Sequence, residues 1–205
     1  MDLDSFYNSI LNIGNKDKYN DIVKEEYQKI KTADGLLMFM DKINYGYLSK
    51  NGKVYLNNDG DWYLEYILEN TSDILTTMTG NCFDQTELER DWFTKNNYYV
   101  ETYFEMVNLD YENTYPTHAF LIYRNNNNWY LFEHADYKNK GIHGFTSKEE
   151  LLRFQMDNYI LYLKTFNISD SELARIILRK FERPKEHIDA KEYLDYVVNS
   201  EIVNI

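Results

Sequence analysis

The sequence predicts an α+β fold in which an antiparallel sheet lies between two groups of helices. Stretches that alternate with period two, or that are rich in aromatic and β-branched residues, cluster between residues 98 and 136. Apolar residues at helical spacing dominate on both sides of that region. Strands that are grouped together, instead of alternating with helices, are typical of α+β proteins. An antiparallel sheet packed on a helix, with further helices at both ends, is therefore the expected architecture.

Six helices are expected before the sheet. Apolar residues recur at helical spacing in each of them, and the ranges are 3–11, 19–30, 32–43, 62–68, 72–78 and 82–95. Ser72 is the expected cap of the fifth helix. Turn residues fill the stretch 45–61, where only residues 53–56 have the composition of a short strand.

Three strands are expected in the middle of the chain. Residues 98–105 alternate between two sets of side chains, as a half-buried strand does. A loop over 109–116 follows. The stretches 118–123 and 129–136 are then joined by a polar turn, which is a β-hairpin signal.

The C-terminal part is expected to be helical. Residues 141–145 form a loop that leads to a helix opened by Ser147 and Glu150, which are spaced as a capping box. Further helical patterns cover 159–163, 172–181 and 190–198.

Composition favours one folded domain over the whole chain, 1–205. With 43% hydrophobic residues, 8 Gly and 2 Pro, the chain can bury a core, and it has no linker-like stretch. We expect a helical N-terminal part (1–50), a central core (80–150) and C-terminal helices (150–205), all packed on the same sheet.

The charge balance and the single cysteine restrict the class of protein. The formal net charge is −12, without a run of Lys or Arg, which disfavours nucleic-acid binding. One cysteine excludes an internal disulfide and fits a reducing compartment. The start of the chain has Asp2 and Asp4 where a signal peptide needs positive charge, and no apolar run approaches the ~18 residues of a membrane span. A cytoplasmic protein without membrane contact is expected, and no cofactor fingerprint appears.

Cys82 is the first candidate for chemistry. It follows the tight turn of Gly80 and Asn81 and begins a helix. At a helix start, unpaired amides and the helix dipole favour a thiolate over a thiol. The thiolate is the form that nucleophilic catalysis requires. The alternative is a cysteine packed under the turn as a small buried apolar residue.

His118 opens the first strand of the hairpin, where a general base can face a cleft, although polar edge residues are also common there. With a turn centred on 125–127, His118 lies opposite Glu133 or Ala135. In the second register, Glu133 is its diagonal neighbour on the same face and would orient the imidazole. Asp136 is the rival carboxylate, but parity places it on the other face unless a bulge intervenes.

This arrangement resembles the transglutaminase-like superfamily, the circularly permuted relatives of papain-type cysteine proteases. The likeness rests on Gly80-Asn81-Cys82, on the strand 118–123 and on the partner strand 129–133, and it covers about a third of the chain. The stretches CFDQTELERDWF, THAFLIY and KGIHGF are also similar to uncharacterised transglutaminase-like proteins of Gram-positive bacteria and their phages.

The resemblance implies a papain-like core in which Cys82 is the nucleophile, His118 the general base and Glu133 the orienting carboxylate. Two positions depart from the superfamily pattern. Glu133 stands where an Asp is usual, and Phe83 follows the nucleophile where a Trp is common.

The resulting hypothesis is an acyl-transfer enzyme that acts on an amide or ester bond of a protein or peptide substrate. The amide of Cys82 is the expected first donor to the oxyanion. The candidates for the second donor are Trp62, Tyr45, Tyr47 and Asn81. The first rival is an inactive module of the same fold that binds a protein partner. The second is a zinc site of Cys82, His118 and His134, which would need a fourth ligand.

Overall fold

A six-stranded antiparallel sheet organises the chain in this computed structural model, which describes residues 16–58, 60–108 and 115–204. The strand order is β6-β5-β4-β3-β7-β8, and every pair is antiparallel. The strands are β3 (Tyr99–Val107), β4 (His118–Asn125), β5 (Asn128–Glu133), β6 (Gly141–Phe145), β7 (Ile176–Phe181) and β8 (Glu201–Val203). The mixed helix and sheet content, with grouped strands, confirms the α+β expectation.

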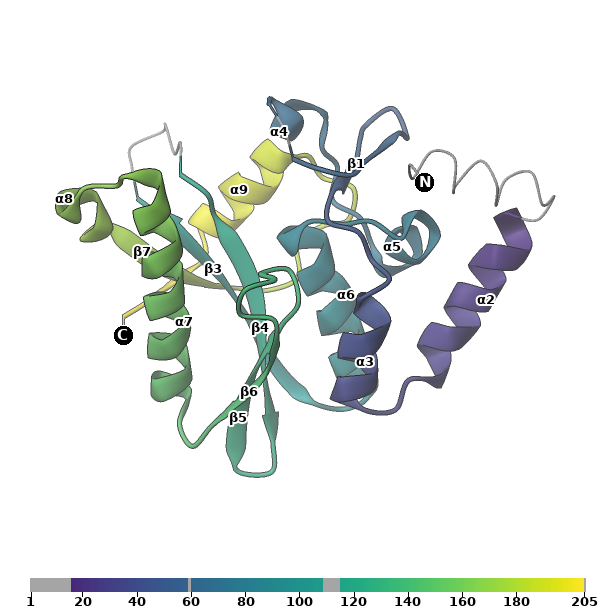
Figure 1. The fold of residues 1–205 in the computed structure, drawn as a ribbon, viewed down its shortest axis with the longest axis horizontal. Helices are drawn as coiled ribbons and strands as arrows, with labels where there is room; N and C mark the ends of the chain where they lie inside the picture. The colour runs from purple at the N-terminus through teal and green to yellow at the C-terminus, as the bar shows by residue number, and fades with distance from the viewer. Residues whose placement is uncertain (1–15, 59, 109–114, 205) are drawn as a thin grey trace.

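Helices cover both faces of the sheet. The helix α6 (Cys82–Lys95) packs on Leu121 and Tyr123 of β4, together with α2 (Lys16–Lys29), α3 (Ala33–Met40) and α5 (Thr71–Thr77). The helix α7 (Lys148–Leu163) packs on Phe120 and Ile122, which alternate with the first pair. Figure 1 shows α7 on one side of the sheet and α6 with α3 on the other.

The remaining elements are short. They are β1 (Tyr47–Leu48), β2 (Val54–Tyr55), α4 (Trp62–Glu65), the 3-10 helix η1 (Lys164–Phe166), α8 (Asp170–Leu173) and α9 (Ala190–Val198). The strands β1 and β2 form a separate two-stranded sheet. In the described part of the chain, no helix combines the length and the apolar character needed to cross a bilayer.

Most of the expected elements are confirmed. The helices over 19–30, 32–43, 82–95 and 190–198, the strand from residue 98, the hairpin and the short strand within 53–56 are all present within a few residues. Ser147 caps α7 by accepting a hydrogen bond from the amide of Glu150. The expected helix 3–11 and most of the loop 109–116 lie outside the described residues.

Two helix expectations near residue 70 need correction. The helix expected over 62–68 ends at Glu65, and Tyr66 is extended (φ −61°, ψ 145°). The backbone beyond it bonds to neighbouring segments instead, with the amide of Ile67 donating to Leu48. The cap of α5 is Asn70 rather than Ser72, because Asn70 and Asp73 form a reciprocal capping box.

Two further stretches are strands. The predicted helix over 172–181 is wrong, since α8 ends at Leu173 and Ile176–Phe181 is β7, paired along the outer edge of β3. Residues 141–145, expected as a loop, form β6 against β5. In both cases long-range pairing with an open strand edge outweighs the local pattern, as β-propensity generally allows.

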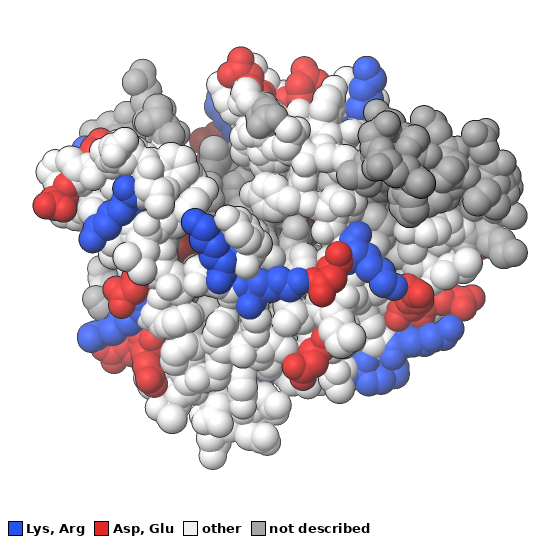
Figure 2. All heavy atoms as spheres, in the orientation of Figure 1, with Lys and Arg blue, Asp and Glu red and all other residues white. Residues whose placement is uncertain are grey.

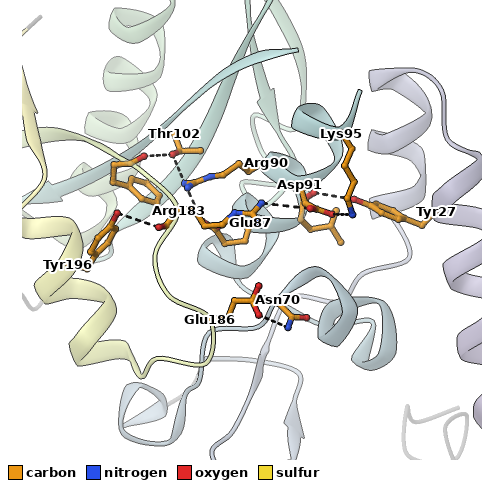
Figure 3. A network of polar contacts seen from close by, with 12 residues as sticks. Tyr27, Asn70, Glu87, Arg90, Asp91, Lys95, Thr102, Arg183, Glu186 and Tyr196 are labelled. Atoms are coloured by element: carbon orange, nitrogen blue, oxygen red, sulfur yellow. Dashed lines mark hydrogen bonds and ion pairs between the residues drawn. The ribbon is translucent and has the colours of Figure 1, made fainter. Parts of the chain in front are cut away.

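Buried polar contacts fix α6 to the sheet. The Nη2 of Arg90 donates to the hydroxyl of Thr102 (2.5 Å), and that hydroxyl donates to the carbonyl of Phe181 (2.6 Å). Arg90 also pairs with Glu87, one turn earlier on the helix (3.2 Å). Figure 3 shows these contacts joining α6 to β3 and to the end of β7. These contacts hold α6, the helix that carries Cys82, against β3 and the end of β7.

The same network reaches the C-terminal segment. Arg183 lies 3.6 Å from Glu87 and 3.8 Å from Asp91, and Lys95 pairs with Asp91 (2.7 Å). These outer pairs are more exposed than the Arg90–Glu87 pair, so each contributes less to stability.

Arg90→Met should lower the free energy of unfolding by about 3–5 kcal/mol, because it leaves the buried carboxylate of Glu87 with only the more distant and more exposed Arg183. The double variant Arg90→Met/Glu87→Gln should recover a large part of that loss. Urea denaturation followed by tryptophan fluorescence measures both.

Lys95→Met is the matched control, since the Lys95 side chain is 67% exposed and its pair with Asp91 should be worth less than about 1 kcal/mol. Equal losses for Arg90→Met and Lys95→Met would contradict the anchoring role of Arg90.

Candidate active site

Cys82 is the first residue of α6, as the sequence predicts. Asn81 caps the helix, and its side-chain oxygen accepts from the amide of Phe83 (2.9 Å). The amide of Cys82 has no acceptor among the hydrogen bonds of the described residues, so this donor stays available at the helix start. The cysteine is free and only 5% exposed.

Asp84 fixes the turn that precedes Cys82. Its fully buried carboxylate accepts from the hydroxyl of Tyr66 (2.8 Å) and from the amides of Glu69 (2.9 Å) and Asn81 (3.0 Å). Burial raises the pKa of Asp84 to about 7 despite these three donors. Gly80 is needed here because a Cβ at this position would come within 2.9 Å of the Asp84 side chain.

His118 begins β4 and contacts Glu133 at the end of β5. Its Nε2 lies 2.8 Å from Oε2 of Glu133, and the amide of Asp136 donates to Oε1 of the same carboxylate (2.8 Å). The ladder pairs Leu121 with Phe132, which extrapolates to Ala135 opposite His118. Glu133 is therefore the diagonal neighbour of His118, and the second of the two predicted registers is confirmed.

The imidazole of His118 also interacts with Cys82. Burial alone lowers the pKa of His118, but the charge of Glu133 and hydrogen bonding to Cys82 and Glu133 together raise it well above its usual value. The three predicted residues are thus brought together, with the histidine between the sulfur and the carboxylate. Their catalytic roles stay predictions.

A cavity of about 730 Å³ opens beside this group. His118 lies in its wall at the end of the sheet, and α7 contributes Gln155, Tyr159 and Tyr162. The other lining residues are Asp41, Ile43, Tyr45, Gln85, Glu105, Pro116, Thr117, His134, Ala135, Asp136, Tyr137, Lys138 and Lys140. Lys140 pairs with Asp41, and on the face shown in Figure 2 basic side chains lie among acidic ones.

Tyr45 is the member of the predicted oxyanion donors that lies in the cavity wall. Burial of its hydroxyl and the neighbouring Cys82 raise the pKa of Tyr45 well above its usual value, although 44% of the residue as a whole is exposed. Trp62 and Tyr47 belong instead to an aromatic cluster around Phe83. The side-chain oxygen of Asn81 accepts the helix-cap hydrogen bond, but its Nδ2 is a buried donor with no partner among the described residues, so Asn81 stays a candidate for the second donor.

The remaining histidines and Asp136 have other partners. The Nδ1 of His134 bonds to Gln85 of α6 (2.7 Å), on the face opposite Glu133. Asp136 accepts from the amide of Lys138, and only its backbone contacts Glu133. In the described ranges, no three His, Cys, Asp or Glu side chains are grouped so that they could hold a metal ion. The proposed zinc set of Cys82, His118 and His134 is not brought together.

Two buried acids near the site were not singled out from the sequence. Glu105 lies opposite His118 in the β3–β4 ladder, and burial raises its pKa to about 8. Glu89, two turns along α6 from Cys82, is 3% exposed, and burial and the charge of Glu133 raise its pKa well above the usual range. The sequence contains one indication that Glu105 is buried, because this acid directly follows the aromatic residues Tyr103 and Phe104 within the expected strand.

No protein-family model matches the chain, and no curated protein matches it.

Glu133→Gln should lower the pKa of His118 by about one unit or more, because the change removes the carboxylate charge and leaves burial as the dominant effect. An NMR titration of the imidazole Cε1–H resonance measures this shift, with His118→Ala used to assign the signal.

Asp136→Asn serves as the control in this titration. The contact of Asp136 with Glu133 is made by its backbone amide, so the pKa of His118 should change much less. An unchanged His118 titration in Glu133→Gln would show that the pair does not control the protonation of the imidazole.

Proposed function

We propose that the chain is a cysteine-dependent acyl-transfer enzyme with a transglutaminase-like core, in which Cys82, His118 and Glu133 form the catalytic group. The observation that carries the proposal is the position of His118, whose imidazole lies 2.8 Å from the Glu133 carboxylate and close enough to Cys82 for this residue to help raise its pKa. A nucleophile, a base and a group that orients the base in this order are the functional signature of triad enzymes.

The arrangement of the elements supports the same proposal. The nucleophile begins a helix that packs on an antiparallel sheet, the base begins the next strand but one, and the carboxylate ends the partner strand. A papain-like core has this order of parts in the permuted form that the sequence resemblance implies. Glu133 in place of an Asp is accommodated because the amide of Asp136 holds its second oxygen.

The proposed reaction proceeds through a thioester. The thiolate of Cys82 attacks the carbonyl carbon of an amide or ester, and the carbonyl oxygen becomes an oxyanion that accepts from the amide of Cys82 and the hydroxyl of Tyr45. The protonated His118 gives its proton to the leaving amine or alcohol as the bond to carbon breaks. Water or an amine then attacks the thioester, His118 removes the proton of that nucleophile, and the bond between carbon and sulfur breaks to release the Cys82 thiolate beside the protonated His118.

The raised pKa of His118 suits the first step. Because Glu133 and Cys82 favour the charged imidazole, the histidine holds the proton that the leaving group needs. The same positive charge lies next to Cys82, the proposed nucleophile.

The competing function is an inactive module of the same fold that binds a protein partner. The observation in its favour is that Cys82 is only 5% exposed. Its neighbours His118 and Tyr45 line the cavity, whereas Cys82 itself is not among the lining residues. Reactivity of Cys82 in the folded protein separates the two functions.

Cys82 should be alkylated by iodoacetamide at pH 6 far faster than free glutathione, whose thiol is almost wholly protonated there. His118→Ala should shift the profile of rate against pH toward that of an ordinary thiol, and Glu133→Gln should do so in part. Mass spectrometry of the intact protein gives the rate without ambiguity, because Cys82 is the single cysteine. A thiol that stays unmodified at pH 6 and pH 8 in the folded protein would favour the binding module.

Tyr45→Phe should slow acylation by p-nitrophenyl acetate about 10²–10³-fold, the usual effect of losing one oxyanion donor. Alkylation by iodoacetamide forms no oxyanion, so its rate should remain nearly unchanged. Parallel stopped-flow and mass-spectrometric rates test this separation. Equal losses in both reactions would mean that Tyr45 acts on the thiolate rather than on the oxyanion.

A further inference from the structure

The wall of the cavity contains two buried oxygen atoms without hydrogen-bond partners. These atoms are Oε1 of Glu105 and Oε1 of Gln155. Both side chains line the cavity, and their residues are 0% and 2% exposed. A buried acceptor that is left unpaired costs about 1–3 kcal/mol, so once Glu105 is ionised the two oxygens together indicate a ligand that donates to both.

The two side chains also face each other. The Nε2 of Gln155 donates to Oε2 of Glu105 at 3.4 Å, a long contact that leaves both Oε1 atoms for another donor. Glu105 comes from β3 and Gln155 from α7, so the sheet and its covering helix each contribute one acceptor. Glu105 lies directly opposite His118 in the ladder, which places this part of the cavity wall beside the proposed catalytic group.

The buried acid favours a cation as the donor, and the cavity wall around it holds Asp41 and Asp136 together with the basic residues His118, Lys138 and Lys140. Burial raises the pKa of Glu105 to about 8, and the charges of Glu133 and Asp136 act in the same direction while His118 opposes them. A bound cation would compensate the ionised Glu105 and would also supply the missing N–H donors. A neutral alcohol offers a single O–H donor and no charge, so it would satisfy the site poorly.

We propose that Glu105 and Gln155 form a subsite for an ammonium or guanidinium group of the substrate. That the bound molecule is a substrate rests on the proposed function, whereas binding of the cation itself does not depend on catalysis. The cation belongs either to a side chain of the acyl-bearing molecule or to the amine that accepts the acyl group.

Calorimetric titration of the full chain carrying Cys82→Ala with n-butylammonium, at pH 7, tests the subsite without any turnover. Binding is expected for n-butylammonium and not for n-butanol. Because Glu105 is largely protonated at pH 7, binding of the cation should release close to one proton, which appears as a different heat in buffers with different ionisation enthalpies.

Glu105→Gln should weaken the binding of n-butylammonium at least tenfold and abolish the proton release. Glu69→Gln is the matched control, since Glu69 is another buried acid with a raised pKa (about 9) that lines a different cavity, and it should leave binding unchanged. Gln155→Leu provides a second variant if Glu105→Gln fails to fold, and it should also weaken binding. Equal binding of n-butanol, or equal loss in the Glu69 control, would overturn the subsite.

Activity assays with the chain that retains Cys82 distinguish the two sources of the cation. If the cation is the acceptor, n-butylamine should be converted to N-butylacetamide in the presence of p-nitrophenyl acetate. If it is a side chain, kcat/KM for the p-nitrophenyl ester of Nα-blocked lysine should exceed that of the norleucine ester, and Glu105→Gln should remove the difference. An active enzyme with neither effect would overturn the subsite. Cation binding by a chain whose Cys82 proves inert would retain it and reject only the proposed acyl transfer.

Discussion

The buried carboxylate of Asp84 is the contact on which the candidate site depends. It draws together the hydroxyl of Tyr66, the amide of Glu69 and the amide of Asn81, which come from two separate segments. The start of α6 is thereby fixed against the stretch that runs toward α5. Without these donors the carboxylate would be buried at high cost, so the turn, the helix cap and the position of Cys82 are stabilised together.

The sheet supplies the second constraint. The diagonal contact of His118 with Glu133 exists only in the register that places Asn126 and Asn127 in the hairpin turn. A slip of one residue would move every side chain of one strand to the other face, and His118 would lose Glu133. The geometry of a short turn at one end of the hairpin therefore determines the proposed catalytic contact at its other end.

The sequence predicted the parts of the structure that local chemistry decides. The start of α6 at Cys82 and the hairpin follow from turn residues and from alternation over a few positions, which also narrowed the pairing of His118 with Glu133 to two registers, and the ladder decides for the diagonal one. The strand β7 could not be predicted in this way, because residues 176–181 are a strand only through their pairing with β3. Tyr45 was one of several equal candidates, and its contact with Cys82 depends on how distant segments pack.

The buried acids make the net charge of the folded chain less negative than its composition indicates. The formal net charge of −12 treats Glu69 and Glu105 as ionised, yet burial raises their pKa values to about 9 and 8. Both carboxyls ionise when unfolding exposes them to water, since an exposed glutamate titrates near ~4.3. Folding at neutral pH is therefore coupled to the uptake of protons, and the contribution of these groups to stability declines as the pH rises from about 4.5 toward 9. For these groups, mildly acidic surroundings therefore increase the free energy of unfolding of an acidic chain.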